Sequence, residues 1–182
     1  MKKKGIANLI MVAVITLIMA AGIVAAVLMG GKTDPVTPGG TSAELLNTGT
    51  GSYSCTVAIR CDTILSNLSR LEEGKAAYVP ENGYILAETV VSFTEGETVF
   101  DVLSRVCKGA DIQLEYSWNP LYNSYYVEGI HHLYEFDCGP ESGWVYTVNG
   151  GHPNYGSSDY QVQPDDQIVW CYSCAGLGTD VR

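Results

Sequence analysis

Six cysteines are the residues of this 182-residue chain whose chemistry is easiest to state: Cys55, Cys61, Cys107, Cys138, Cys171 and Cys174. All six follow a long apolar N-terminal run, and none lies within it. Thiols in this number on one exported segment favour disulfides formed in an oxidising compartment. The sequence leaves their pairing open.

The spacing of the cysteines restricts that pairing. The segment from Cys55 to Cys61 alternates apolar and mostly polar residues, which predicts a strand with both thiols on its buried face. Six steps along a strand span about 20 Å, too far for a bond between the two. We therefore expect each to have a distant partner, with Cys171 and Cys174 on the last strand the natural candidates. The Cys171–Cys174 spacing also fits a redox motif or half a zinc site, but redox motifs usually precede a helix and no second such pair exists.

Three histidines are the other candidate metal ligands. His131 and His132 are adjacent and are expected on a strand, where their side chains would point to opposite faces and not chelate one ion. His152 lies alone in a loop. No hydroxyl or thiol has an evident base and orienting partner, and no pair of carboxylates stands out for glycoside hydrolysis. We predict that the protein is not an enzyme and holds no metal.

Aromatic residues are concentrated in the C-terminal third. Nine of the 12 tyrosines and all three tryptophans lie between Tyr116 and Tyr172. Trp144 and Trp170 belong to alternating segments and are interpreted mainly as sheet core, whereas rings in loops lie at the surface and suit flat ligands, sugars or protein partners. The predicted ligand-binding residues are Tyr122, Tyr125, Tyr126, Trp144, His152, Asn154 and Tyr155.

The N-terminus reads as a membrane segment. Lys2–Lys4 precede an uncharged run over 5–29, which as a helix at about 1.5 Å per residue would exceed a hydrocarbon core of about 30 Å. We predict an uncleaved transmembrane anchor over 1–31, with the lysines inside the cell; a cleaved signal peptide, which would leave a secreted protein, is the alternative. A Pro, Gly, Thr and Ser-rich linker over 32–52 then leads to one extracytoplasmic domain over 53–182.

The charge balance excludes one class of partner. The formal net charge is −10, and four of the 10 basic residues flank the apolar run, which leaves six basic against 20 acidic residues, or −14, for the exported part. Such a surface repels nucleic acid. The acidic pairs, among them Asp165-Asp166, lack the spacing of a calcium loop and are interpreted as solvated surface.

The elements that must position these residues are strands around a central helix. Thr98 and Asp101 form a capping box ahead of an apolar stripe that ends at Gly109, and a shorter helix is expected between Asp62 and Gly74. A tyrosine-rich loop is expected over 119–126, and Asn149-Gly150 predicts a tight turn. Alternating segments predict strands over 55–61, 84–94, 112–118, 143–148 and 167–172. The order indicates an α+β fold with one main helix packed on a mixed sheet.

The order of motifs resembles the domain of unknown function 4430 (DUF4430), also described as the transcobalamin-like C-terminal domain. The segments that carry the resemblance are Gly96–Leu103, Val127–Ile130, Gly143–Gly150 and Tyr160–Trp170. The segments Cys61–Leu65 and Leu133–Gly139 look like a version of this domain found on Gram-positive bacterial surfaces. The resemblance spans roughly residues 53–178.

The resemblance implies a β-grasp-like fold, related to the small domain that covers one side of the corrinoid in cobalamin carriers, and no enzymatic activity. Those carriers have a second, helical domain that this chain is too short to contain, so a changed ligand is also expected. We predict a small-ligand capture domain, with a corrinoid as the named candidate; direct ligation of its cobalt by His152 is the less favoured alternative. A membrane transporter or second surface protein would complete the site. The alternative is an adhesive module for a protein or a cell-wall polysaccharide.

Overall fold

The computed structural model describes residues 53–181, so the predicted anchor over 1–31 and linker over 32–52 lie outside the described part. Within residues 53–181, no helix has the length and apolar character needed to cross a membrane. The elements in chain order are β1 (Tyr53–Arg60), α2 (Asp62–Leu65), η1 (Leu68–Arg70), η2 (Lys75–Tyr78), β2 (Tyr84–Phe93), α3 (Val99–Gly109), β3 (Leu114–Asn119), β4 (Ser124–Ile130), β5 (Leu133–Tyr134), β6 (Gly143–Val148), β7 (Gln167–Ser173) and η3 (Gly176–Gly178).

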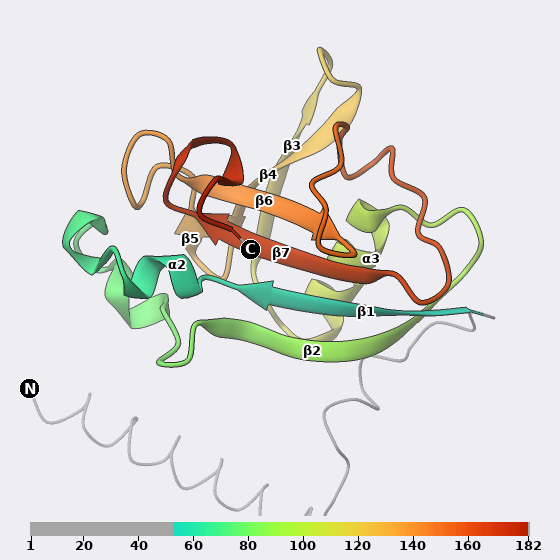
Figure 1. The fold of residues 1–182 in the computed structure, drawn as a ribbon, viewed down its shortest axis with the longest axis horizontal. Helices are drawn as coiled ribbons and strands as arrows, with labels where there is room; N and C mark the ends of the chain where they lie inside the picture. The colour runs from blue at the N-terminus through green and yellow to red at the C-terminus, as the bar shows by residue number, and fades with distance from the viewer. Residues whose placement is uncertain (1–52, 182) are drawn as a thin grey trace, which may run out of the picture. The chain divides into compact units, whose positions relative to one another are not determined.

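A four-stranded sheet in the order β2-β1-β7-β6 runs across the front of the molecule in Figure 1. Its two central strands, β1 and β7, are parallel, and the outer pairs are antiparallel. Val57 lies opposite Ile168 and Ile59 opposite Trp170, and all four side chains are buried. The period-two pattern of both segments therefore fills one core behind this sheet.

A second, antiparallel sheet has the order β3-β4-β5. The predicted mixed sheet is therefore present as β2-β1-β7-β6, but it does not include every strand, because β4 pairs with the two-residue β5 and not with β6. A side chain joins the two sheets instead: the indole N–H of Trp144 on β6 donates to the carbonyl of Leu133 on β5 at 2.8 Å. The predicted α+β class with one main helix is confirmed.

The main helix, α3, begins where the capping box predicts. The Thr98 hydroxyl accepts the Asp101 N–H at 3.2 Å, and the Asp101 carboxylate accepts the Thr98 N–H at 2.9 Å. The apolar stripe from Val99 to Cys107 is buried, and the helix ends at Gly109 as expected. Figure 1 shows α3 behind the four-stranded sheet, where this stripe contributes to the core.

The predicted helix between Asp62 and Gly74 is wrong in its length. It breaks into the four-residue α2 and the short 3-10 turn η1, and Asp62 lies inside α2 without acting as its cap. Of its expected apolar stripe, Ile64 is buried, whereas Leu65 and Leu68 are exposed. A helical stripe without a partner surface gains little from burial, so nothing holds a longer helix together.

Candidate functional site

The β3–β4 hairpin presents most of the predicted binding residues. Its turn is Pro120–Asn123, in which Asn119 Oδ1 accepts the Leu121 N–H at 3.0 Å and Asn123 has a left-handed backbone with φ of 47°. Asn119 pairs with Ser124 and Trp118 with Tyr125. Tyr125 and Tyr126, expected in a loop, therefore lie on strand β4.

Stacked rings hold the hairpin on α3. The Tyr125 ring stacks on Phe100 with centroids 4.5 Å apart and an interplanar angle of 24°. Tyr116 and Trp118 meet the same Tyr125 ring edge-on at 5.2 and 5.1 Å. Such contacts favour one orientation of the hairpin, so the turn beyond them has a defined position.

The loop over 151–160 is fixed against this hairpin. The Tyr125 N–H donates to Ser158 Oγ at 3.0 Å, and the Ser158 N–H donates to Ser124 Oγ at 3.3 Å. At Gly156 the loop backbone comes so close to the Ser124 side chain that an added Cβ would lie 2.1 Å from Ser124 Oγ. The Tyr146 hydroxyl on β6 also donates to the Tyr155 carbonyl of this loop at 2.8 Å. Two segments about 33 residues apart thus form one surface.

Between hairpin and loop lies a pocket of about 290 Å³, which we call the aromatic pocket. Its lining residues are Asn119, Tyr122, Ser124, Tyr125, Tyr126, Asn154, Tyr155 and Gly156. Five of these are predicted binding residues. Asn119, Ser124 and Gly156 were not predicted as binding residues. Asn119 and Ser124 lie at the two ends of a hairpin turn, and this position is the signal that would have identified them. Tyr122 and Tyr155 are 68% and 54% exposed, so their rings remain available.

The other two predicted residues, Trp144 and His152, do not line the aromatic pocket. Trp144 is 6% exposed, and its indole N–H is already engaged with Leu133. It borders a separate pocket of about 240 Å³ that shares Tyr126 with the aromatic pocket. His152 is exposed, and its ring lies beside Gly178.

No carboxylate, ammonium or guanidinium group lines the aromatic pocket. The Tyr126 hydroxyl donates to the Glu135 carboxylate at 2.6 Å, and burial, followed by this hydrogen bond, raises the pKa of the phenol well above its usual range. The hydroxyl therefore stays protonated and occupied, so Tyr126 offers its ring. The amides of Asn119 and Asn154 add hydrogen-bonding groups without charge.

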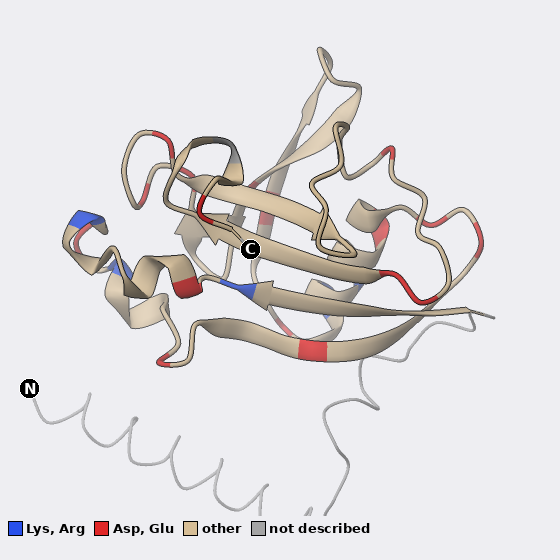
Figure 2. Ribbon diagram, viewed as in Figure 1, with Lys and Arg blue, Asp and Glu red and all other residues tan. Residues whose placement is uncertain are grey.

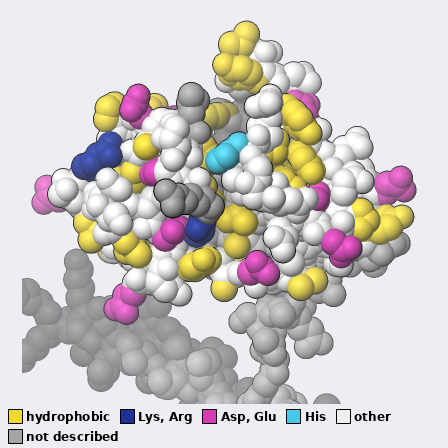
Figure 3. Space-filling model, in the orientation of Figure 1, with side chains coloured by type: hydrophobic (Ala, Val, Ile, Leu, Met, Phe, Trp, Pro, Cys, Tyr) yellow, Lys and Arg dark blue, Asp and Glu magenta, His cyan; other side chains and the backbone are white. Residues whose placement is uncertain are grey.

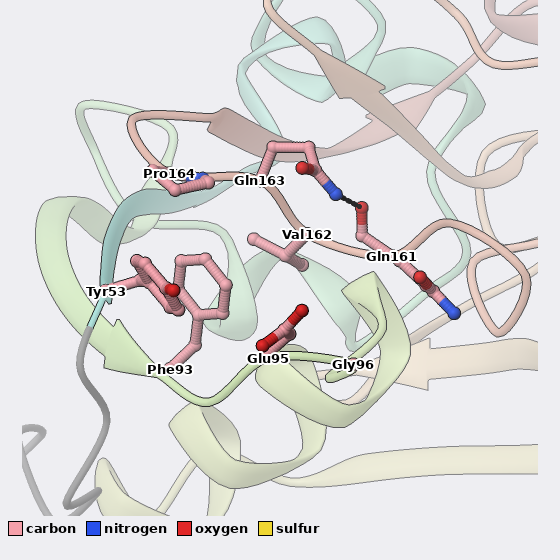
Figure 4. A pocket seen from close by; sticks show the side chains of 8 residues that line it. All are labelled: Tyr53, Phe93, Glu95, Gly96, Gln161, Val162, Gln163 and Pro164. Atoms are coloured by element: carbon pink, nitrogen blue, oxygen red, sulfur yellow. Dashed lines mark hydrogen bonds between the residues drawn. The ribbon is translucent and has the colours of Figure 1, made fainter.

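A larger pocket of about 410 Å³ lies at the start of β1 (Figure 4). Tyr53 and Phe93 form one wall with ring centroids 5.8 Å apart, and Glu95 and Gly96 form another. The Gln163 side chain donates to the Gln161 carbonyl at 3.1 Å (Figure 4). Here the two rings contact each other and the lining includes the Glu95 carboxylate, so the aromatic pocket offers the better surface for a flat, uncharged ligand. Sequence reasoning singled out none of these residues.

The metal-ligating residue types are dispersed. Within residues 53–181, no group of three or more His, Cys, Asp or Glu is arranged to hold an ion. His131 and His132 lie in a turn and not on the expected strand, both with positive φ, because β4 ends at Ile130. The six thiols are all buried. Of the expected partners on the last strand, Cys171 Sγ accepts a hydrogen bond from Arg60 Nε at 3.2 Å, and Cys174 lies beside Cys138.

Comparison with known proteins gives one family match. Residues 96–173 match the model of a domain of unknown function, DUF4430, as predicted. No curated protein matches the chain. Among solved structures, haptocorrin in complex with Cbi is 15% identical with a TM-score of 0.49, over 70% of this chain and 26% of the haptocorrin chain. A Ruminococcus gnavus ATCC 29149 protein described as metal binding is 12% identical with a TM-score of 0.40, over 67% of this chain and 97% of its own.

Proposed function

We propose that the extracytoplasmic part of this chain, whose residues 96–173 match the DUF4430 model, binds an uncharged small ligand in the aromatic pocket. The observation that carries this proposal is that two exposed tyrosines, Tyr122 and Tyr155, line one pocket whose lining contains no ionic group. Ring faces bury much apolar area at a small cost in conformational entropy, and the Asn119 and Asn154 amides orient the ligand.

The size of the pocket bears on what fills it. A drug-sized ligand is usually enclosed by about 300–1,000 Å³, whereas the aromatic pocket has about 290 Å³. It therefore accommodates a small ligand or one face of a larger one. A corrinoid, a broad ring bordered by amides, is the larger ligand we propose to test first. A transporter or second surface protein would then cover its other face.

Titration of the exported domain with cobalamin, cobinamide and haem, followed by visible absorbance and calorimetry, tests this function. Tyr122→Ala and Tyr155→Ala should each weaken binding by about 5–10-fold, since a stacked ring contributes about 1 kcal/mol beyond its area. Tyr84→Ala is the matched control, because Tyr84 is also exposed but does not line the aromatic pocket. No heat and no spectral change at high micromolar ligand would exclude independent corrinoid binding.

The adhesive function has one observation in its favour. Trp118, Leu121 and Tyr122 are all exposed on the hairpin, and Figure 3 shows hydrophobic side chains gathered at its tip. Aromatic surfaces of this kind also stack on sugar rings. Retention of the domain on peptidoglycan or cell-wall polysaccharide, lost with Trp118→Ala and kept with Tyr84→Ala, would favour this alternative over small-ligand capture.

We also propose that residues 1–31 anchor the domain outside the membrane, on the strength of the lysines and the apolar run that follows them. The full chain should then sediment with membranes and resist alkaline extraction, while protease added to intact cells should remove the domain. Release of a shortened, soluble protein would show instead that the segment is cleaved.

A further inference from the structure

Two sulfurs meet where the C-terminal end of β7 reaches the turn that follows β5. Cys138 Sγ and Cys174 Sγ lie 3.1 Å apart, and the side chains are 0% and 1% exposed. Two unbonded sulfurs at van der Waals contact would be farther apart, whereas a disulfide closes the gap with a small movement. We infer that Cys138 and Cys174 form a disulfide that fastens the β5–β6 turn to β7.

The surroundings hold both cysteines in place for this bond. The Cys138 N–H donates to Ser142 Oγ at 3.0 Å, and Ser142 Oγ lies 3.0 Å from the Tyr172 hydroxyl. On the other side, the Cys174 N–H donates to the Asp180 carboxylate at 2.9 Å. The two backbones are therefore anchored independently of the sulfurs, so the bond can form without rearranging either segment.

The burial of the pair indicates when the bond forms. Thiol–disulfide exchange needs a thiolate, and burial, followed by the contact with Cys138, raises the pKa of Cys174 to about 12. The folded, reduced pair would react slowly, so oxidation must precede the sealing of this site. The oxidant is a disulfide: the two Cys thiols are oxidised to one S–S bond, and the reagent is reduced to two thiols that take up both protons.

The remaining thiols differ in their contacts. Cys171 lies on β7, and its sulfur accepts a hydrogen bond from Arg60 Nε at 3.2 Å. Cys171 therefore serves as a control cysteine: it lies on β7, three residues before Cys174, and its sulfur contacts a different partner. The partner that we infer for Cys174 is therefore Cys138, and not the expected Cys55 or Cys61.

Peptide mapping of the exported domain, secreted into an oxidising compartment and alkylated without reduction, tests the bond directly. No Lys or Arg lies between Lys108 and Arg182, so trypsin leaves Cys138, Cys171 and Cys174 on one peptide, and pepsin at acid pH is required. A linked Cys138–Cys174 peptide supports the inference. Alkylated Cys138 or Cys174, or either one linked to another cysteine, overturns it.

Thermal unfolding provides a second readout. When the bond is reduced in denaturant and the protein is then refolded, its Tm should be about 10 °C lower, since the bond closes a loop of 36 residues. The Cys138→Ala/Cys174→Ala double variant should lose this redox-dependent shift, and Cys171→Ala should keep it. Reduced protein should re-form the bond with oxidised glutathione much faster in denaturant than when folded; equal rates would contradict the proposed order of oxidation and folding.

Discussion

The close contact between Gly156 and the Ser124 side chain shows how a single residue shapes the aromatic pocket. The space for a Cβ is already occupied by Ser124 Oγ at 2.1 Å. The side-chain hydroxyl cannot simply turn away without disturbing its hydrogen bond from the Ser158 N–H. The distance between hairpin and loop is therefore set by the absence of a side chain at this position.

Gly156→Ala should destabilise the domain by about 1–3 kcal/mol, because the added methyl group overpacks the contact with Ser124. Gly151→Ala is the control: a Cβ there meets its nearest neighbour at 3.5 Å, so the change should stay within about 0.5 kcal/mol. Urea unfolding measures both. Equal stabilities for the two variants would mean that the hairpin and loop are not in close contact.

Tyr172 is fully buried, and its hydroxyl has partners in the turn after β5. It donates to the Tyr134 carbonyl at 2.7 Å and lies 3.0 Å from Ser142 Oγ. Tyr172→Phe should lower the free energy of unfolding by about 1–2 kcal/mol, since it leaves buried polar groups unsatisfied. Tyr122→Phe, at an exposed ring, should leave stability unchanged. A chemical denaturation curve for each variant decides between these expectations.

Among the elements, α3 depends on a local device. Thr98→Ala removes the hydroxyl that accepts the Asp101 N–H and should cost about 1 kcal/mol. Ser104→Ala, in the middle of the same helix, should be neutral or slightly stabilising, because alanine has the higher helix propensity. If urea unfolding shows no loss for Thr98→Ala, the capping box makes no net contribution to stability.

The contrast between α3 and α2 shows what can be read from sequence. The start of α3 was predictable because Thr98, Asp101 and the apolar stripe are neighbours in the chain. The length of α2 was not, because it depends on whether Leu65 and Leu68 find a surface to cover. The division into two sheets likewise depends on pairings between distant strands, which no local pattern records.

The same distinction applies to the candidate site. Tyr122 and Tyr155 were predictable because aromatic residues in turns lie at the surface. That they line the same pocket depends on the hydrogen bonds of Ser158 with Ser124 and Tyr125, which join residues about 33 positions apart in the chain. Asp166 was wrongly expected on the solvated surface: it is 4% exposed and accepts the Asn149 side-chain amide at 2.8 Å.

At the scale of the whole molecule, charge and aromatic surface are segregated. Figure 2 shows acidic residues on many turns and loops and also on β2 and α2, while the tip of the β3–β4 hairpin carries neither sign. An acidic exterior keeps anionic polymers away. Because the tip carries no charge, neutral ligands meet no electrostatic barrier at the aromatic pocket.

Buried phenols should make the domain sensitive to alkali. Burial raises the pKa of Tyr126, Tyr146 and Tyr172 above the ordinary value of about 10. Above pH 10 the unfolded chain releases protons that the folded chain retains, so stabilisation present below that pH is lost as pH rises further. Urea unfolding from pH 7 to 11 measures this loss. Tyr172→Phe should show a shallower decline than wild type, and an identical slope would exclude its phenol as a contributor.

The parallel pairing of β1 with β7 has a consequence for the order of synthesis and export. Thr56 and Gln167 are partners on the two central strands, so the sheet cannot close until β7 has been synthesised. Contacts of such long sequence separation also slow folding. Until then the thiols of β1 and of the β5–β6 turn remain open to oxidants and to chaperones. The interval between the synthesis of β1 and the closure of the sheet is thus a window for quality control, and its length is determined by the position of β7 in the chain.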